Sequence, residues 1–150
     1  MAKLPIIEYP NPILLKKSAK IKDPKDKKIQ KMIADMLETM KIANGLGLAA
    51  PQIGKSLRLC VIEDQGETYI LINPKITSLS RKKIAMEEGC LSFPGDFFSI
   101  SRPEKVQIRY LDKEGAKVKL KADGLLARAL QHEIDHLDGI LFITRVKKNK

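Results

Sequence analysis

The alternation of apolar and polar positions predicts one long helix in the first third of the chain. Asp23 followed by Pro24 is a typical helix start, because aspartate caps free N–H groups and proline fits the first turn. Asn44-Gly45 marks its end. Apolar side chains recur between them at the spacing of a buried helix face: Ile29, Met32, Ile33, Met36, Leu37 and Met40. We interpret this methionine-rich stripe as core and not as a cofactor site.

Short apolar or alternating runs follow and predict strands. These runs cover residues 57–62, 68–72, about 84–86, 97–101, 105–111 and 116–121. The residues from Asp112 to Gly115 indicate a hairpin turn between the last two. A second helix follows, with Asp123 as N-cap and Gly139 as stop, before a short buried segment at 140–143. This order predicts an α+β fold in which antiparallel β-sheets pack around the second helix.

The composition is that of a single domain over residues 1–150. The chain has 43% hydrophobic and 31% charged residues, and this length is enough to bury a core. It contains no apolar run of about 18 residues, so we expect no membrane span. Residues 1–5 resemble neither a signal core nor a transit peptide. Two cysteines suit a reducing cytosol, and we expect no disulfide.

The second predicted helix carries the side chains with the clearest chemistry. His132, Glu133 and His136 form the pattern H-E-x-x-H, and the chain has no other histidine. Residues four apart share one helix face, so both imidazoles can bind one metal ion with Glu133 as a general base. Leu125 and Ala129 continue this face and turn the histidines inward. The alternative is a solvated amphipathic helix that binds no metal.

The pattern leaves the third metal ligand open. A catalytic site of the zinc type needs three protein ligands and one open position. Downstream of the histidines, Asp138 is the only acid and lies too close in sequence to serve. Phe142 stands where an extended H-E-x-x-H motif would place a third histidine. The third ligand must therefore lie upstream.

Two cysteines are the upstream candidates. Cys60 lies in a strand-like run and is interpreted as a core thiol. Cys90 lies between Gly89 and a predicted turn at Pro94-Gly95, and is either a metal ligand or an inert loop thiol. The acids Glu87 and Glu88 precede it and could support a metal ligand.

Three segments together resemble the signature motifs of the peptide deformylase family. The segments are Gly45-Leu46-Gly47-Leu48-Ala49-Ala50-Pro51-Gln52, Glu88-Gly89-Cys90-Leu91-Ser92 and Gln131-His132-Glu133-Ile134-Asp135-His136-Leu137-Asp138-Gly139. They stand in the family's order at about its spacing, and the resemblance runs from residue 4 to about residue 145. It implies one catalytic domain over residues 1–150. The extended C-terminal helix of many bacterial members is not expected here.

The resemblance implies a metal-dependent hydrolase that removes the formyl group from N-formylmethionyl peptides. Cys90, His132 and His136 would bind one divalent metal ion. Family members typically use Fe²⁺, and Zn²⁺, Ni²⁺ or Co²⁺ can occupy the same site. A thiolate with two imidazoles suits each of these ions, so the residues do not choose among them.

The resemblance also assigns roles to other residues. Glu133 would move the proton, and the Gln52 amide with the Leu91 backbone N–H would stabilise the oxyanion. Gly47 would approach the formyl group and, with Gly45, shape a narrow slot. The apolar pocket for the methionine side chain has four candidates, each of which could equally be ordinary core: Met86, Leu91, Leu125 and Ala129.

The net charge of +10 leaves two interpretations open. One is a solvated lysine-rich surface, and the other is contact with a polyanion. Because the substrates of the family emerge from ribosomes, we expect weak, salt-sensitive ribosome association through the basic surface. We expect no membrane partner, no specific DNA, and a bacterial cytoplasmic location, with an organelle as the alternative. Rival functions are a peptidase and a basic nucleic-acid-binding module with a structural metal.

Overall fold

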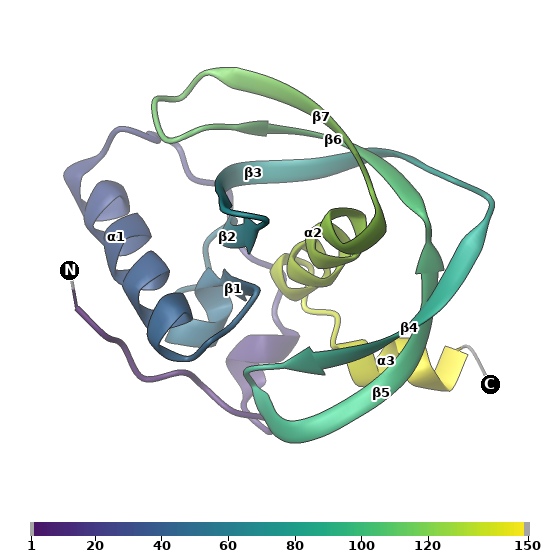
Figure 1. The fold of residues 1–150 in the computed structure, drawn as a ribbon. Coiled ribbons are helices and arrows are strands. Elements are labelled where there is room, and N and C mark those ends of the chain that lie inside the picture. The colour runs from purple at the N-terminus through teal and green to yellow at the C-terminus, as the bar shows by residue number, and fades with distance from the viewer. Residues whose placement is uncertain (1, 149–150) are drawn as a thin grey trace.

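Two antiparallel sheets surround helix α2 in the computed structural model, which describes residues 2–148 (Figure 1). Within these residues, the larger sheet has the strand order β1-β2-β3-β6-β7 and the smaller sheet pairs β4 with β5. The strands of the larger sheet are β1 (Gly47–Ala49), β2 (Leu59–Asp64), β3 (Glu67–Leu79), β6 (Lys105–Leu111) and β7 (Lys117–Asp123). The smaller sheet comprises β4 (Lys83–Cys90) and β5 (Phe93–Pro103). The α+β class with antiparallel sheets is confirmed.

Three α-helices and two short 3₁₀ helices complete the described chain. They are η1 (Pro12–Leu15), α1 (Lys27–Ile42), η2 (Ala50–Ile53), α2 (Gly124–Leu137) and α3 (Phe142–Lys148). No helix within residues 2–148 has the length and apolarity that crossing a membrane requires.

Helix α1 begins later than its sequence predicts. The Asp23 carboxylate accepts from the Lys25 backbone N–H (3.0 Å) in a turn, and Asp26 is the cap, accepting from Lys28 N–H (2.8 Å). Both aspartates can satisfy free N–H groups, so composition alone does not separate a turn from a helix start. The helix ends before Asn44, which has a left-handed φ of 56°. Its buried face packs against β1 and β2.

Helix α2 packs on one face of the larger sheet. Val106, Ile108 and Leu130 belong to the core cluster between sheet and helix. Asp123 occupies the N-cap position, but its side chain makes no capping hydrogen bond. Gly139 follows the helix with φ 73°, a conformation that favours glycine. The sheet therefore holds the middle and end of α2 rigidly, where its polar residues lie.

The arms of the smaller sheet are longer than predicted. We expected strands near 84–86 and 97–101, with a turn at Pro94-Gly95, but both residues lie inside β5. Proline fits there because it stands at the start of a strand in a two-stranded sheet. The register shifts between Gly89 and Cys90, at the end of β4. Cys90, which follows this irregularity, lies beside His136 of α2.

The N-terminal segment lies across the outside of the structure and reaches the region between the sheets. Ile7 N–H donates to the Gln52 carbonyl (2.7 Å), and Tyr9 N–H donates to the Ser92 carbonyl (2.9 Å). Backbone contacts of this kind join η2 to the β4–β5 connection. Both of these segments belong to motifs that the sequence singled out.

Candidate metal centre

Helix α2 brings both histidines to one place. His132 and His136 are one turn apart, their ring centroids are 5.0 Å apart, and both are buried. Cys90, at the end of β4, places its Sγ 3.3 Å from His136 Nε2. One ligand atom from each of these three residues lies within 4.8 Å of the others. Metal–sulfur bonds of about 2.3 Å and metal–nitrogen bonds of about 2.0 Å require separations of this size, so the three residues fit one metal ion.

Cys60 lies elsewhere and does not join this group. It is fully buried in the cluster between the larger sheet and α2, and burial raises the pKa of its thiol well above the usual value. A thiol in such surroundings is inert. The three-residue group therefore draws its sulfur from Cys90.

A carboxylate orients His132. Its Nδ1 lies 3.0 Å from Glu88 Oε1, which leaves Nε2 to face Cys90 and His136. Glu88 also accepts two hydrogen bonds from Arg102, at 2.5 and 3.0 Å, and one from Arg128. Burial alone would raise the pKa of Glu88, but hydrogen bonds with His132 and Arg102 outweigh it and lower the pKa to about 2. Glu88 is therefore a permanent buried anion beside the imidazole.

The two arginines connect this carboxylate to the rest of the fold. Arg102 Nη1 donates to Asp135 Oδ2 (2.9 Å), and Arg145 of α3 donates to both Asp135 oxygens at 3.0 and 2.8 Å. Arg128 also donates to backbone carbonyls of both arms of the smaller sheet. Since buried charges are tolerated only when paired, this network fixes α2 against β4, β5 and α3.

Glu133 lies beside the metal-ligand group but makes no hydrogen bond through Oε1 to the described residues. Burial raises its pKa to about 7. A carboxyl group that changes protonation near neutral pH can both accept and donate a proton. The backbone of Gly47 packs against it, since a Cβ at residue 47 would lie 2.6 Å from Glu133 Oε2. Gly47 thus makes room for this carboxylate.

Gln52 faces the same group from η2. Its Oε1 accepts from Ala49 N–H (2.9 Å), and its Nε2 donates to Ser92 Oγ (3.1 Å) and approaches Cys90 Sγ (3.7 Å). Ser92 Oγ in turn donates to the Ile7 carbonyl (2.7 Å). The Gln52 amide is therefore held in one orientation, with its N–H groups turned toward Cys90.

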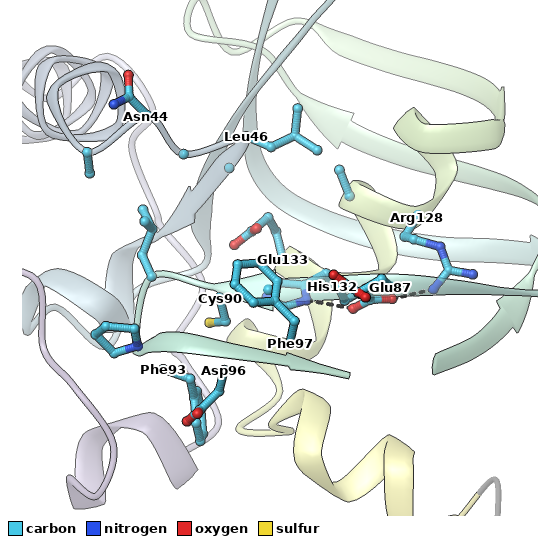
Figure 2. Close-up of a pocket in the computed structure, with 18 of the residues that line it drawn as sticks. Asn44, Leu46, Glu87, Cys90, Phe93, Asp96, Phe97, Arg128, His132 and Glu133 are labelled. Carbon is cyan, nitrogen blue, oxygen red and sulfur yellow. Dashed lines mark hydrogen bonds and ion pairs between the residues drawn. The ribbon is translucent and has the colours of Figure 1, made fainter. Parts of the chain in front are cut away.

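A cavity of about 430 Å³ opens beside these residues (Figure 2). Its size is typical of a small-molecule or peptide side-chain site. Cys90, His132, Glu133 and Phe97 all line it and are labelled in Figure 2. The sequence-predicted residues that line it are Gly45, Gly47, Gln52, Cys90, Leu91, Leu125, Ala129, His132 and Glu133.

Met86 is the exception, and its assignment to the pocket is wrong. It is 37% exposed and does not line the cavity. On β4 the cavity lining begins at Glu87, the next residue along the strand, so Met86 lies just outside the cavity wall. Gly45 lines the cavity as expected, but the group that packs against its backbone is the Leu91 side chain. A Cβ there would lie 2.6 Å from Leu91 Cδ1, so this glycine makes room for a wall residue.

The similarity to known proteins agrees with this geometry. The family model described as polypeptide deformylase matches residues 3–150. The peptide deformylase of Thermodesulfovibrio yellowstonii is 48% identical, covering 100% of this chain and 93% of the relative, and that of Bartonella quintana is 47% identical, covering 97% and 85%. The chain belongs to the polypeptide deformylase family.

Solved structures of the family share the fold. The crystal structure of peptide deformylase from Thermotoga maritima has a TM-score of 0.94 and 36% identity, covering 97% of this chain and 98% of that chain. The Synechococcus elongatus peptide deformylase in complex with actinonin has a TM-score of 0.93 and 40% identity, covering 97% and 79%. Deformylases are hydrolases that remove the N-formyl group from nascent peptides, and this is the function of the chain. The family is metal-dependent.

Several deformylase-site contacts were not predicted from the sequence. Ser92, Arg102, Arg128 and Phe97 all touch the site residues or line the cavity, and the sequence pattern assigns none of them a role there. A buried Arg102 leaves one signal in the sequence, because it follows Phe98 and Ile100 at alternate positions of β5 and so interrupts an apolar face. Ser92 leaves none beyond its place in the cysteine motif.

Proposed function

We propose that Cys90, His132 and His136 hold one divalent metal ion, which is Fe²⁺ in the native protein. A soft thiolate ligand together with two neutral imidazoles also binds Zn²⁺, Ni²⁺ or Co²⁺. When bound, the ion makes water more acidic and polarises a carbonyl oxygen. Because metal ligands must be deprotonated, metal binding is coupled to proton release. Hydrogen bonds with Cys90 and Glu88 raise the pKa of His132 to about 10 against the effect of burial, so a proton is present to be displaced.

Glu133 is the proton carrier of the hydrolysis. Its carboxylate takes one proton from water, whose oxygen forms a bond to the formyl carbon. The carbon–nitrogen bond then breaks, and Glu133 passes the proton to the leaving amine nitrogen, so that formate and a free N-terminus result. The raised pKa and the unpaired Oε1 support this role.

Gln52 and Leu91 stabilise the negative charge that develops on the formyl oxygen. The Gln52 amide is already oriented by Ser92 and Ala49, which avoids reorganisation during the reaction. Leu91 follows the irregular end of β4 and lines the same cavity, which supports this role for its backbone N–H. Gly47 lets Glu133 lie close to the formyl group, and Leu125 with Ala129 and Leu91 surround the methionine side chain.

The observation that carries this proposal is the meeting of Cys90, His132 and His136 beside a buried Glu133. Its test is formate release from formyl-Met-Ala-Ser by protein purified and assayed without oxygen, with metal analysis of the same sample. We expect release and one equivalent of iron. Glu133→Ala should retain the metal and lose turnover. Cys90→Ser with unchanged metal affinity and activity would contradict the ligand assignment.

We further propose that residues 1–150 act as a single catalytic domain in the bacterial cytoplasm, although one chloroplastic relative, from Oryza sativa, is 40% identical. The net charge of +10 supports weak, salt-sensitive association with ribosomes, from which nascent peptides emerge. Co-sedimentation with ribosomes at low salt, lost at high salt, is the expected result. Sedimentation that ignores salt would contradict the electrostatic origin.

A further inference from the structure

Three cations stand opposite one another across three neighbouring strands. Lys75 of β3 is in register with Arg109 of β6, and Arg109 is in register with Lys119 of β7. Directly opposite residues on antiparallel strands point to the same face, with Cβ atoms about 4.5–5.5 Å apart. Like charges in such positions destabilise a sheet. This row therefore lowers the stability of the folded protein, and the packing of the core does not explain its presence.

More basic side chains extend the row along the same face. Alternate residues of a strand share a face, which adds Lys105 of β6 and Lys117 and Lys121 of β7. We call the six residues the basic sheet face: Lys75, Lys105, Arg109, Lys117, Lys119 and Lys121. All six are exposed, and none forms an ion pair with another residue in the range 2–148. Asp123, in register with Lys105, is the one acid paired against them on these strands.

The basic sheet face is turned away from the catalytic helix. The opposite side of the same strands, including Val106, Ile108 and Leu120, packs on α2. In Figure 1, β6 and β7 lie above α2, whereas β4 and β5 lie below it. The cavity is lined by residues of β4, β5, α2 and the segment around β1, and by none of the six residues of the basic sheet face. A large partner on this face would leave the cavity open to a peptide.

We propose that the basic sheet face binds the phosphate backbone of RNA. Phosphates would neutralise the repulsion between Lys75, Arg109 and Lys119, and the exposed amide of Gln107 adds a neutral hydrogen-bonding group within the face. A membrane surface fits less well, because interfacial binding uses exposed apolar anchors. The large exposed apolar side chains lie elsewhere, and Leu79, which is on β3, is in register with the α2-facing Val106. This inference rests on the ribosome association proposed above and names the surface responsible.

The test compares two triple variants that remove the same charge. One is Lys75→Gln/Arg109→Gln/Lys119→Gln, and the control is Lys16→Gln/Lys55→Gln/Lys83→Gln at exposed positions outside the face. Binding to fluorescent poly(U) is measured by anisotropy over a series of KCl concentrations. In a plot of log binding constant against log salt concentration, each phosphate contact to a single strand contributes about −0.7 to the slope. The sheet variant lacks three cations, so its slope should be shallower by about 2. Its affinity at low salt should fall about tenfold, and the control should stay close to wild type.

Two outcomes would overturn the proposal. Equal loss of RNA binding in both variants would show that only net charge matters. Unchanged poly(U) binding in the sheet variant, with loss of binding to phosphatidylglycerol vesicles, would assign the face to membranes. Formate release from formyl-Met-Ala-Ser is measured on the same samples and should be equal in all three proteins, so the failure of RNA binding is distinguishable from failure of the catalytic proposal.

Discussion

The backbone of Gly47 packs so closely on Glu133 that a Cβ at residue 47 would lie 2.6 Å from Oε2 and 3.0 Å from Cδ. The end of a glutamate side chain can move, and Glu133, although only 5% exposed, borders the cavity into which it could be pushed. Any side chain at residue 47 therefore displaces the carboxylate from the metal-ligand group. This relationship couples the first signature motif to the third.

Gly47→Ala should lower kcat about 10- to 100-fold, the range seen when a general acid–base group is misplaced. KM and thermal stability should change little, because the displaced group is one side-chain end. Gly66→Ala is the matched control: its Cβ meets nothing within 4 Å, but its φ of 81° is strained for alanine. It should lose stability and keep kcat. Steady-state kinetics and thermal unfolding of both variants separate the two effects.

Glu88→Gln should weaken both metal binding and folding. It leaves Arg128 buried without its counter-charge and Arg102 paired with Asp135 alone, and breaking a buried ion pair in this way costs about 3–5 kcal/mol of unfolding free energy. It also weakens the hydrogen bond that orients His132, and such changes reduce metal affinity about 10- to 100-fold. Chemical denaturation and competition with a chelator measure the two effects.

Arg128→Met provides the comparison for this variant. Methionine keeps an apolar stem at the cavity wall, and Glu88 keeps both hydrogen bonds from Arg102. The loss of metal affinity should therefore be smaller than in Glu88→Gln. Equal losses in the two variants would contradict the view that Glu88 acts on His132 directly.

Ser92→Ala should lower kcat through Gln52. The substitution removes the acceptor for Gln52 Nε2 and the donor for the Ile7 carbonyl, at a cost of about 1–3 kcal/mol in stability. The amide then loses its fixed orientation toward the oxyanion, so kcat should fall while KM stays near its original value. Ser18→Ala is the control, because this buried hydroxyl has no hydrogen-bond partner within residues 2–148. It should retain both activity and stability.

Acid should release the N-terminal segment from α1. Hydrogen bonds from Lys31 and from the Ala2 backbone N–H (2.8 Å) lower the pKa of Asp35 below its usual 3.8. A carboxyl whose folded pKa is depressed stabilises the protein above its unfolded pKa, and this contribution disappears as pH falls through the lower folded pKa. The stability difference between wild type and Asp35→Asn should therefore be constant at neutral pH, begin to shrink near 3.8, and be lost as pH falls through the lower folded pKa. Denaturation at several pH values measures it.

The sequence predicted elements well where local pattern decides them. Strand β6 was expected at 105–111 and is Lys105–Leu111, because its alternation matches a sheet with one buried face. The prediction from local pattern is wrong at Pro94-Gly95, where the residues favour a turn but pairing of β5 with β4 maintains a strand. At the start of α1, two aspartates compete for the cap and only tertiary contacts decide between them.

Some parts of the candidate site also follow from local sequence pattern, whereas others depend on the packed fold. Helical periodicity is enough to bring His132 and His136 together. Excluding the downstream residues leaves the two cysteines as candidates, and the family resemblance assigns the third ligand to Cys90. The contacts of Glu88 with Arg102 and Arg128 join three elements that are distant in sequence. No spacing rule connects such residues, so only the packed fold reveals them.

Arg109→Gln should stabilise the free protein. Arg109 stands between Lys75 and Lys119 in register, so its removal relieves two like-charge contacts, each worth about 0.2–1 kcal/mol. Salt screens exposed charges over about 10 Å at 0.1 M, so the gain in Tm should be largest at low salt and shrink as salt is added. Lys83→Gln, with Pro103 as its register partner on β5, should show no comparable gain. With saturating poly(U), the wild type should have a higher Tm than Arg109→Gln, because RNA binds and stabilises the wild-type protein more than the variant. A lower Tm for Arg109→Gln in low salt without RNA would contradict the idea that this row is kept at the expense of stability.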